Sequence, residues 1–274
     1  MTSELDQRYA DVRGSIAEAA RVSGRSPDDI YLVAVTKYAE PEQILRLIEL
    51  GHRDFGENRV QQLVQRASMS EEWLKRAGVL KRTAEAKPDI PTNQDALRWH
   101  MIGQIQRNKA RKVAELARLV HSVESFRVAD ELRQALSRSE KVLDVLVQVD
   151  CSGEEAKQGC PMPAATAIAE QIDSMYSLRV RGLMTIAPYS EDPEEARPIF
   201  RRCRELFEDI RKLGFDGPFN ILSMGMTGDY RVAIEEGANI VRVGSAIFGG
   251  GDDESEPPTE QPPEQTPGGE TEAS

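Results

Sequence analysis

Ile30-Tyr-Leu-Val-Ala-Val-Thr-Lys37 is a short run of β-branched and apolar residues that ends abruptly in a lysine. Such a run is typical of a strand buried on both faces, as in a parallel sheet that is covered by helices. Residues 38–40 have the character of a loop, and Pro41 indicates the first turn of a helix. The segment therefore predicts a strand, a loop and a helix in succession, with the lysine at the strand end.

Lys37 stands where a charged side chain is costly, because taking an ammonium group out of water is unfavourable. The same cost lowers the pKa of a buried lysine and makes its neutral amine available to attack an aldehyde. We therefore expect Lys37 to hold an aldehyde cofactor as a Schiff base. The alternative is a lysine at a strand end whose amine simply reaches solvent, as lysines usually do.

The same alternation of short apolar runs and helical segments continues along the chain. Strands are expected at 30–37, 54–58, 98–102, 119–124, 142–150, 180–187, 220–223 and 239–243. Helices are expected at 3–23, 41–50, 59–67, 103–116, 125–137, 164–175, 194–213 and 229–236. This count predicts an α/β fold, a single closed (β/α)8 TIM barrel with an extra helix at its N-terminus. An open doubly wound sheet gives the same local pattern, and periodicity does not distinguish the two.

Two segments depart from this rhythm. Residues 68–95 are polar and include Pro88 and Pro91, so a surface insertion is expected there, partly helical or mobile. Residues 251–274 are rich in Pro, Glu and Gly and cannot bury enough apolar area to become ordered. We therefore expect one barrel domain over 1–250 and a disordered acidic tail over 251–274.

Charge argues against a nucleic-acid partner, and hydropathy argues against a membrane span. The tail contains eight of the acids, and removing them from the formal net charge of −11 leaves −3 for the barrel domain. A mildly acidic domain lacks the basic face that a nucleic-acid binder needs. No apolar run approaches the ~18 residues of a membrane span, and the N-terminus lacks the apolar core of a signal peptide.

The few cysteines and histidines of the chain do not predict a metal centre. Cys151, Cys160 and Cys203 have neither a paired metal-binding spacing nor an even disulfide framework, so we expect a reducing cytoplasm. The histidines are too scattered along the sequence to form a predicted metal site. A structural or surface role is expected for His52, His100 and His121.

Polar residues gather where the expected strands end. Reactive groups of such barrels lie at the C-terminal ends of the strands, so Lys37 and Asn58 are expected in one mouth. The loops after the seventh and eighth strands form the recurrent phosphate site of this architecture. Backbone amides can approach an anion where residues are small, and hydroxyl groups can donate as well. The residues of this kind are Ser223, Gly225, Thr227, Gly244 and Ser245. Ordinary Gly/Ser turns are the alternative.

Arg242 is expected to face the barrel interior from an otherwise apolar strand. A permanent cation there needs an anion or a ring partner, which could be a phosphate or a heterocyclic nitrogen. A pyridine nitrogen facing Arg242 would stay unprotonated, which weakens the ring as an electron sink. A salt bridge to Glu57 or Asp229 is the alternative. An aldehyde-binding lysine and a phosphate cup on one barrel face indicate pyridoxal 5′-phosphate (PLP) better than other common cofactors.

Six segments, in order along residues 3 to 249, resemble the YggS/PROSC family of pyridoxal phosphate homeostasis proteins. They are Val35-Thr-Lys37, Phe55-Gly-Glu-Asn-Arg-Val-Gln61, Trp99-His-Met-Ile-Gly-Gln-Ile-Gln-Arg-Asn-Lys109, Arg181-Gly-Leu-Met184, Leu222-Ser-Met-Gly-Met226 and Val241-Arg-Val-Gly-Ser-Ala-Ile-Phe-Gly249. The chain departs from the family pattern in its longer 68–95 segment, its acidic tail and Trp99.

The resemblance implies a PLP barrel of fold type III, similar to the N-terminal domain of alanine racemase. It implies PLP bound covalently to Lys37 with Asn58 beside it, and Arg242 near the cofactor. It also implies phosphate contacts from the positions Ser223, Thr227, Gly244 and Ser245.

Three classes of function follow from these expectations. We expect a monomeric cytoplasmic protein of PLP homeostasis that stores or delivers the cofactor without turnover, with apo-enzymes as candidate acceptors. The alternative is a PLP-dependent amino-acid racemase, but two-base racemisation needs a second acid/base group opposite the lysine. We expect only the disordered tail after the eighth strand, with no room for a β-domain, and nothing places Tyr38, Tyr189 or Tyr230 in that role. A structural barrel without a ligand is the third class.

Overall fold

The computed structural model describes residues 3–76, 96–153 and 158–250. Its helices are α1 (Glu4–Val22), α2 (Pro41–Glu49), α3 (Val60–Arg76), α4 (Ala110–Leu116), α5 (Phe126–Ala135), α6 (Met162–Asp173), α7 (Arg197–Arg211), α8 (Tyr230–Glu235) and α9 (Ser245–Phe248). Its strands are β1 (Tyr31–Val35), β2 (Asp54–Glu57), β3 (Arg98–Met101), β4 (Leu119–Val123), β5 (Leu143–Asp150), β6 (Cys160–Pro161), β7 (Leu178–Met184), β8 (Ile221–Ser223) and β9 (Ile240–Val243). Short 3₁₀ turns lie at Pro27–Asp29, Arg107–Lys109 and Pro193–Ala196.

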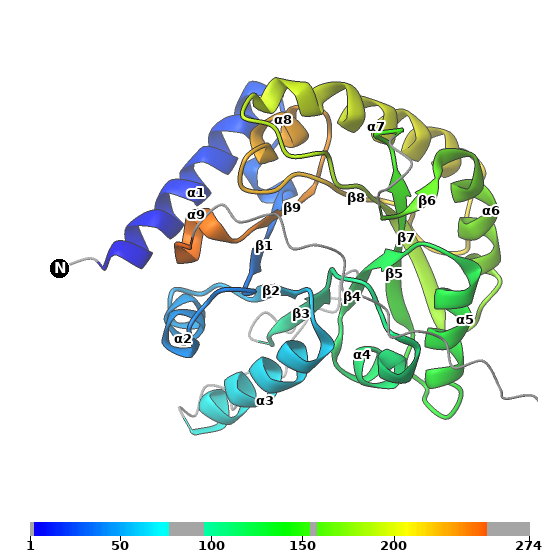
Figure 1. Ribbon diagram of the computed structural model, residues 1–274, viewed down its shortest axis with the longest axis horizontal. Coiled ribbons are helices and arrows are strands. Elements are labelled where there is room, and N and C mark those ends of the chain that lie inside the picture. Colours follow the sequence, from blue (N-terminus) through cyan, green and yellow to red (C-terminus); the bar gives the residue numbers. More distant parts are fainter. Residues whose placement is uncertain (1–2, 77–95, 154–157, 251–274) are drawn as a thin grey trace, which may run out of the picture.

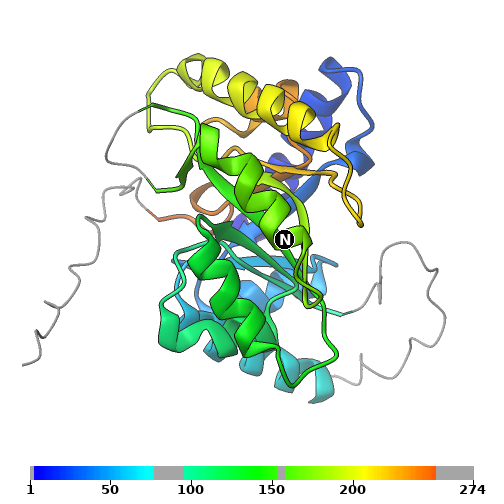
Figure 2. The same ribbon diagram turned by 90° about the vertical axis from the view of Figure 1, so that its right-hand side faces the viewer.

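The strands form a closed parallel barrel. They follow one another in the ring β1-β2-β3-β4-β5-β7-β8-β9, and the ring closes because β9 pairs with β1 while β5 pairs with both β4 and β7. The two-residue β6 pairs with β5 only. Helices surround the strands in Figure 1, and Figure 2 shows the green helices α5 and α6 toward the viewer. The predicted barrel is confirmed, and an open sheet is excluded because it would leave two unpaired edges.

Apolar side chains divide into two clusters, one on each side of the barrel wall. The smaller cluster contains strand residues only, as expected of a barrel interior: Val33, Leu119, Leu146, Met184 and Ile240. The larger cluster joins the outer faces of the strands to the helices. Residues that alternate with this outer set along each strand therefore point inward, and the polar residues among them determine the interior chemistry.

The extra N-terminal helix is confirmed as α1. Its N-cap is Ser3, whose hydroxyl accepts a hydrogen bond from the Asp6 amide at 3.2 Å. The helix buries Leu5, Val12 and Ile16, and it lies against α8 and α9 (Figure 1). The first helix thus packs on the last elements of the barrel, where β9 meets β1.

The predicted elements differ from the structure most in four places. The helix expected over 103–116 begins only at Ala110, after the 3₁₀ turn Arg107–Lys109. The helix expected to end near residue 67 continues to Arg76, because Ser70 and Leu74 keep a buried face on the core. Residues 68–76 are therefore part of α3, while the rest of the expected insertion, 77–95, lies outside the described residues, as does the tail 251–274. The short strand β6 and the short helix α9 were not expected.

Among the described residues, no helix combines the length and apolar character needed to cross a bilayer.

Candidate functional site at the C-terminal end of the barrel

A buried side-chain contact joins the ends of β1 and β2. The Thr36 hydroxyl donates to the Glu57 carboxylate, and Arg66 from α3 forms an ion pair with the same carboxylate. Burial raises the pKa of Glu57, although the hydrogen bonds from Thr36 and Arg66 oppose this shift. Both strand ends are therefore fixed one residue before Lys37 and Asn58.

Lys37 and Asn58 follow the ends of the neighbouring strands β1 and β2. Val35 pairs with Gly56, and continuing this register by two residues places Lys37 opposite Asn58. Lys37 follows β1 after Thr36, within a turn in which the Ala39 amide donates to the Thr36 carbonyl at 2.9 Å. The Lys37 Nζ lies 4.7 Å from the centroid of the exposed Tyr38 ring. Both residues therefore closely follow neighbouring strands at the C-terminal end of the barrel.

The loop that carries Asn58 passes unusually close to Gly103. A Cβ at Gly103 would lie 2.2 Å from the Asn58 carbonyl oxygen, a distance that no side chain can occupy. The Gly103 carbonyl accepts a hydrogen bond from the Ser122 hydroxyl at 2.6 Å, which holds this crossing in place. The glycine in the segment 99–109 is therefore required by the path of the Asn58 loop.

The loops after β8 and β9 meet as a cup of small residues. The Ser245 hydroxyl donates to Thr227 Oγ1 at 3.2 Å, and the Arg242 amide donates to the Gly225 carbonyl at 3.0 Å. Gly225 has a φ of +92°, and a Cβ there would lie 2.8 Å from Tyr230 Cα. Gly244 directly precedes Ser245 and α9. The predicted phosphate-site residues Gly225, Thr227, Gly244 and Ser245 therefore lie in two adjacent loops at one barrel end.

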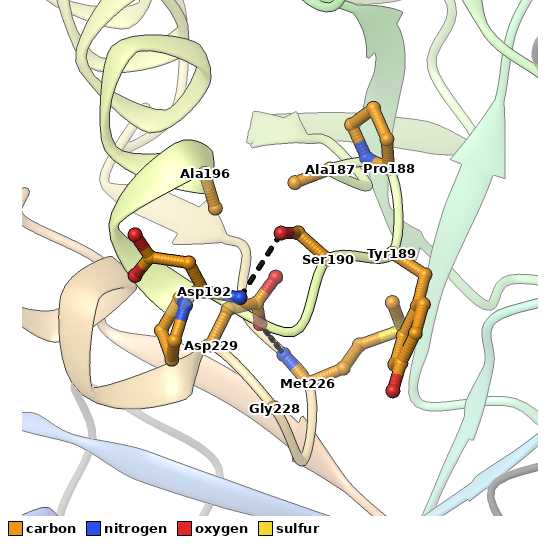
Figure 3. Close-up of a pocket in the computed structure, with 10 residues that line it drawn as sticks. Ala187, Pro188, Tyr189, Ser190, Asp192, Ala196, Met226, Gly228 and Asp229 are labelled. Atoms are coloured by element: carbon orange, nitrogen blue, oxygen red, sulfur yellow. Dashed lines mark hydrogen bonds between the residues drawn. The ribbon is translucent and has the colours of Figure 1, made fainter.

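A small hollow lies beside this cup, between residues 187–193 and 226–229. Figure 3 shows the Met226 side chain extending toward Tyr189, with Asp229 accepting a hydrogen bond from the Met226 amide at 2.6 Å. The hollow measures about 20 Å³. Because one water needs about 10–15 Å³ by this measure, the hollow cannot hold a cofactor ring.

Arg242 is buried at the centre of the barrel, as predicted. Its Nη1 donates to Ser223 Oγ at 2.7 Å and its Nη2 donates to the Thr185 carbonyl at 3.0 Å. Burial lowers its pKa to about 10, with the nearby Asp229 opposing the shift, so the guanidinium stays charged at neutral pH. Within the described residues it forms no ion pair with any carboxylate, including Glu57 and Asp229, so the salt-bridge alternative is wrong.

Ser223 does not join the hydroxyls of Thr227 and Ser245. It is fully buried, and its hydroxyl lies between Arg242 and His121 Nδ1, which is 2.9 Å away. Ser223 therefore supports the arginine from inside the barrel. A direct contact between Ser223 and a phosphate stays a prediction.

The sequence did not reveal a row of hydrogen-bonded groups beneath Arg242. His121 Nε2 lies 2.9 Å from His100 Nδ1, and His100 Nε2 lies 3.2 Å from Asp54 Oδ1. The one sequence feature that could have predicted this contact is the alternation of side chains along β3 and β4, which directs His100 and His121 inward. All three histidines are buried, which excludes the surface role, and His52 contacts Tyr9 instead. The part of the chain that the structure describes contains no cluster of three or more His, Cys, Asp or Glu suited to a metal ion.

The family model described as "Alanine racemase, N-terminal domain" matches residues 17–252. A pyridoxal phosphate homeostasis protein of Pseudomonas aeruginosa is 37% identical over 250 residues, which cover 91% of this chain and 97% of that protein. The chain belongs to the pyridoxal phosphate homeostasis protein family.

Solved structures agree with this membership. A protein of unknown function from Bifidobacterium adolescentis has a TM-score of 0.78 and 33% identity, covering 89% of this chain and 94% of that one. PipY of Synechococcus elongatus PCC7942, solved with PLP bound, has a TM-score of 0.66 and 29% identity, covering 85% of this chain and all of PipY. The family resemblance expected from the six sequence segments is thereby confirmed.

Proposed function

We propose that this chain binds PLP at the C-terminal end of the barrel and holds it covalently through Lys37. The observation that carries the proposal is Arg242, a buried guanidinium without an ion-pair partner among the described residues, below the mouth that contains Lys37. The hydroxyl pair of Thr227 and Ser245 lies at the same end and offers donors for a phosphate. The family membership and the PLP-bound PipY support the same ligand.

Different residues bind different parts of the cofactor. Lys37 would supply the amine that bonds to the aldehyde carbon, with the loss of one water. Thr227, Ser245 and the backbone beside Gly225 and Gly244 hold the phosphate. Asn58 flanks the lysine. When bound, PLP supplies the aldehyde and, in enzymes that use it, an electron sink.

Arg242 favours a carrier over a catalyst. Because it stays protonated at neutral pH, it only donates, and a pyridine nitrogen that accepts from it remains unprotonated. Racemisation also needs a second base. Tyr38 and Tyr189 are 49% and 65% exposed, and Tyr230 packs against the core. We therefore propose storage and delivery of PLP without turnover, with apo-enzymes as acceptors. The monomeric state and the reducing cytoplasm stay predictions. The three cysteines are free and buried.

The test compares delivery with turnover. Purified protein loaded with PLP is offered to an apo-enzyme that needs PLP, and in parallel to D- and L-alanine and serine. We expect activation of the apo-enzyme and no more racemisation than PLP alone gives. Lys112→Ala, which changes an exposed lysine of α4, serves as the control. Rapid racemisation that disappears in Lys37→Ala and persists in Lys112→Ala would establish the racemase instead.

A further inference from the structure

A cavity of about 390 Å³ lies at the N-terminal end of the barrel, the end opposite Lys37. It is half open to solvent and is lined by α1, by the segments leading into β1 and β2, and by the first residue of β3. Tyr9, Arg13, Arg53, Asp54 and Arg98 are among the residues that line it. Its volume falls in the range of small-molecule pockets, about 300–1,000 Å³.

The cavity contains guanidinium groups that no carboxylate neutralises. Arg98 is neutralised, because its Nε and Nη2 donate to Asp54 at 2.7 and 2.5 Å. Arg13 and Arg53 form no ion pair within the described residues, and Asp28 is the one other acid of the lining. Arg53 Nη1 is held by the Ile48 and His52 carbonyls at 2.7 and 2.9 Å. An anion in the cavity would therefore find two guanidiniums and a single unpaired carboxylate.

One wall of the cavity is neutral and fixed. His52 Nε2 donates to the Asp54 carbonyl at 2.7 Å, since a carbonyl oxygen only accepts. Burial lowers the pKa of His52 to about 4, so its Nδ1 accepts the hydroxyl hydrogen of Tyr9 at 3.2 Å. Tyr9 and the exposed Tyr31 then offer rings beside the guanidiniums. This combination suits a small molecule with a flat body and an anionic group.

Asp54 also begins the row of hydrogen bonds that crosses the barrel, and with one proton on each histidine ring the row has a single direction. Asp54 as a carboxylate only accepts, so His100 donates to it through Nε2, and a ring with one proton then accepts at Nδ1. His121, whose pKa burial lowers well below its usual value, then donates to His100 through Nε2 and accepts from the Ser223 hydroxyl at Nδ1. Arg242 can only donate to Ser223. Every group in the row therefore has one consistent role.

We propose that this cavity is a second binding site, for a small molecule bearing a phosphate or carboxylate group, and that the row from Asp54 to Arg242 communicates its occupancy. An anion near Arg98 competes with Asp54 for that guanidinium. The Asp54 carboxylate then accepts more strongly from His100, and the change passes through His121 and Ser223 to Arg242. Binding in the cavity stands by itself, whereas its effect on the cofactor end rests on the proposed function.

Phosphate titrations of the PLP-free full chain test the binding step, with benzoate as the carboxylate arm. We expect two inorganic phosphates per chain by calorimetry. Arg13→Ala, an exposed position of α1, weakens one of them about tenfold or more. Ser245→Asp removes the other. Arg21→Ala on the same helix, where Arg21 pairs with Glu18, is the matched control and changes neither.

This design distinguishes the absence of the cavity site from the absence of the phosphate site at the cofactor end. A single phosphate that responds to Ser245→Asp and not to Arg13→Ala, together with no benzoate binding that Arg13→Ala weakens, overturns the cavity site and leaves the cofactor end intact. A single phosphate that responds only to Arg13→Ala overturns the phosphate site at the cofactor end and leaves the cavity site intact. If benzoate binds and Arg13→Ala weakens its binding, the cavity takes a carboxylate ligand. If phosphate binds in the cavity and benzoate does not, the cavity takes a phosphate ligand.

Histidine nitrogen signals test the communication. In Ser245→Asp, where phosphate reaches the cavity alone, long-range ¹H–¹⁵N spectra should show Nε2–H in both His100 and His121. Added phosphate should shift these signals, and the shift should vanish when Arg13→Ala is added. A proton on Nδ1 of either ring, or signals that phosphate leaves unmoved, overturns the communication.

Discussion

The hydroxyls of Thr227 and Ser245 lie 3.2 Å apart, although they follow two different strands. They meet because the Arg242 amide bonds to the Gly225 carbonyl, which holds the end of β9 against the loop after β8. Either loop alone would be an ordinary turn. Together they present two hydroxyls and the backbone beside two glycines to the mouth that contains Lys37.

Ser245→Asp should weaken PLP binding by about tenfold or more, about 1.4 kcal/mol, because a carboxylate would face the anionic phosphate. Ser245→Ala removes one hydroxyl without adding charge and should cost about 0.5–1.5 kcal/mol. Fluorescence or absorbance titration with PLP measures both. Equal affinities for wild type and Ser245→Asp would contradict the phosphate cup.

Lys37→Ala should abolish covalent PLP binding and the visible absorbance of the loaded protein, because only an amine forms the carbon–nitrogen bond to the aldehyde. Circular dichroism should show an unchanged fold, since the Lys37 side chain is only half-buried. Borohydride reduction followed by peptide mapping locates the modified lysine. Labelling of another lysine in the wild-type chain would refute the assignment, and Lys112→Ala should behave as wild type.

Gly103→Ala should destabilise the protein by several kcal/mol and displace Asn58, because the new methyl group would overlap the Asn58 carbonyl. Gly14→Ala is the matched control. A methyl group added at Gly14, within α1, would point into open space, so alanine should stabilise the helix by up to about 1 kcal/mol. Urea unfolding measures both changes, and a loss of stability in Gly14→Ala as large as in Gly103→Ala would show that the close approach is not the cause.

Stability should fall as the pH decreases from about 6.5 to about 4, because His52 titrates differently in the two states. The unfolded chain takes up a proton on this residue near pH 6.5, whereas burial lowers the folded pKa to about 4. The contribution is fully present above the unfolded value and is lost as the pH falls toward the folded one. It amounts to about 3 kcal/mol for this difference in pKa.

His52→Gln should reduce that slope, because glutamine does not titrate. Urea unfolding at a series of pH values measures it. His121 contributes a loss of the same sign, since burial lowers its folded pKa well below the usual value. A slope identical in wild type and His52→Gln would mean that His52 is not the titrating group.

The sequence by itself determined the order of the strands, the position of Lys37 at a strand end and the family, whereas periodicity left open whether the sheet closes into a barrel. Buried parallel strands have continuous apolar runs, so their number and order are visible in local composition. A lysine at the end of such a run is conspicuous for the same reason, and short motifs at strand ends keep their spacing. The end of α3 was missed because Ser70 and Leu74 are buried by tertiary packing, while their local surroundings are polar.

Only the tertiary structure decided what each interior polar residue contacts. Arg242 could have paired with Glu57 or Asp229 by composition, yet Glu57 is bound by Thr36 and Arg66, and Ser223 accepts from Arg242. His100 and His121 come from adjacent strands and Ser223 from across the barrel. Side chains inside a closed barrel meet according to the stagger of the strands, which depends on ring closure and is not visible in the spacing of residues along the chain.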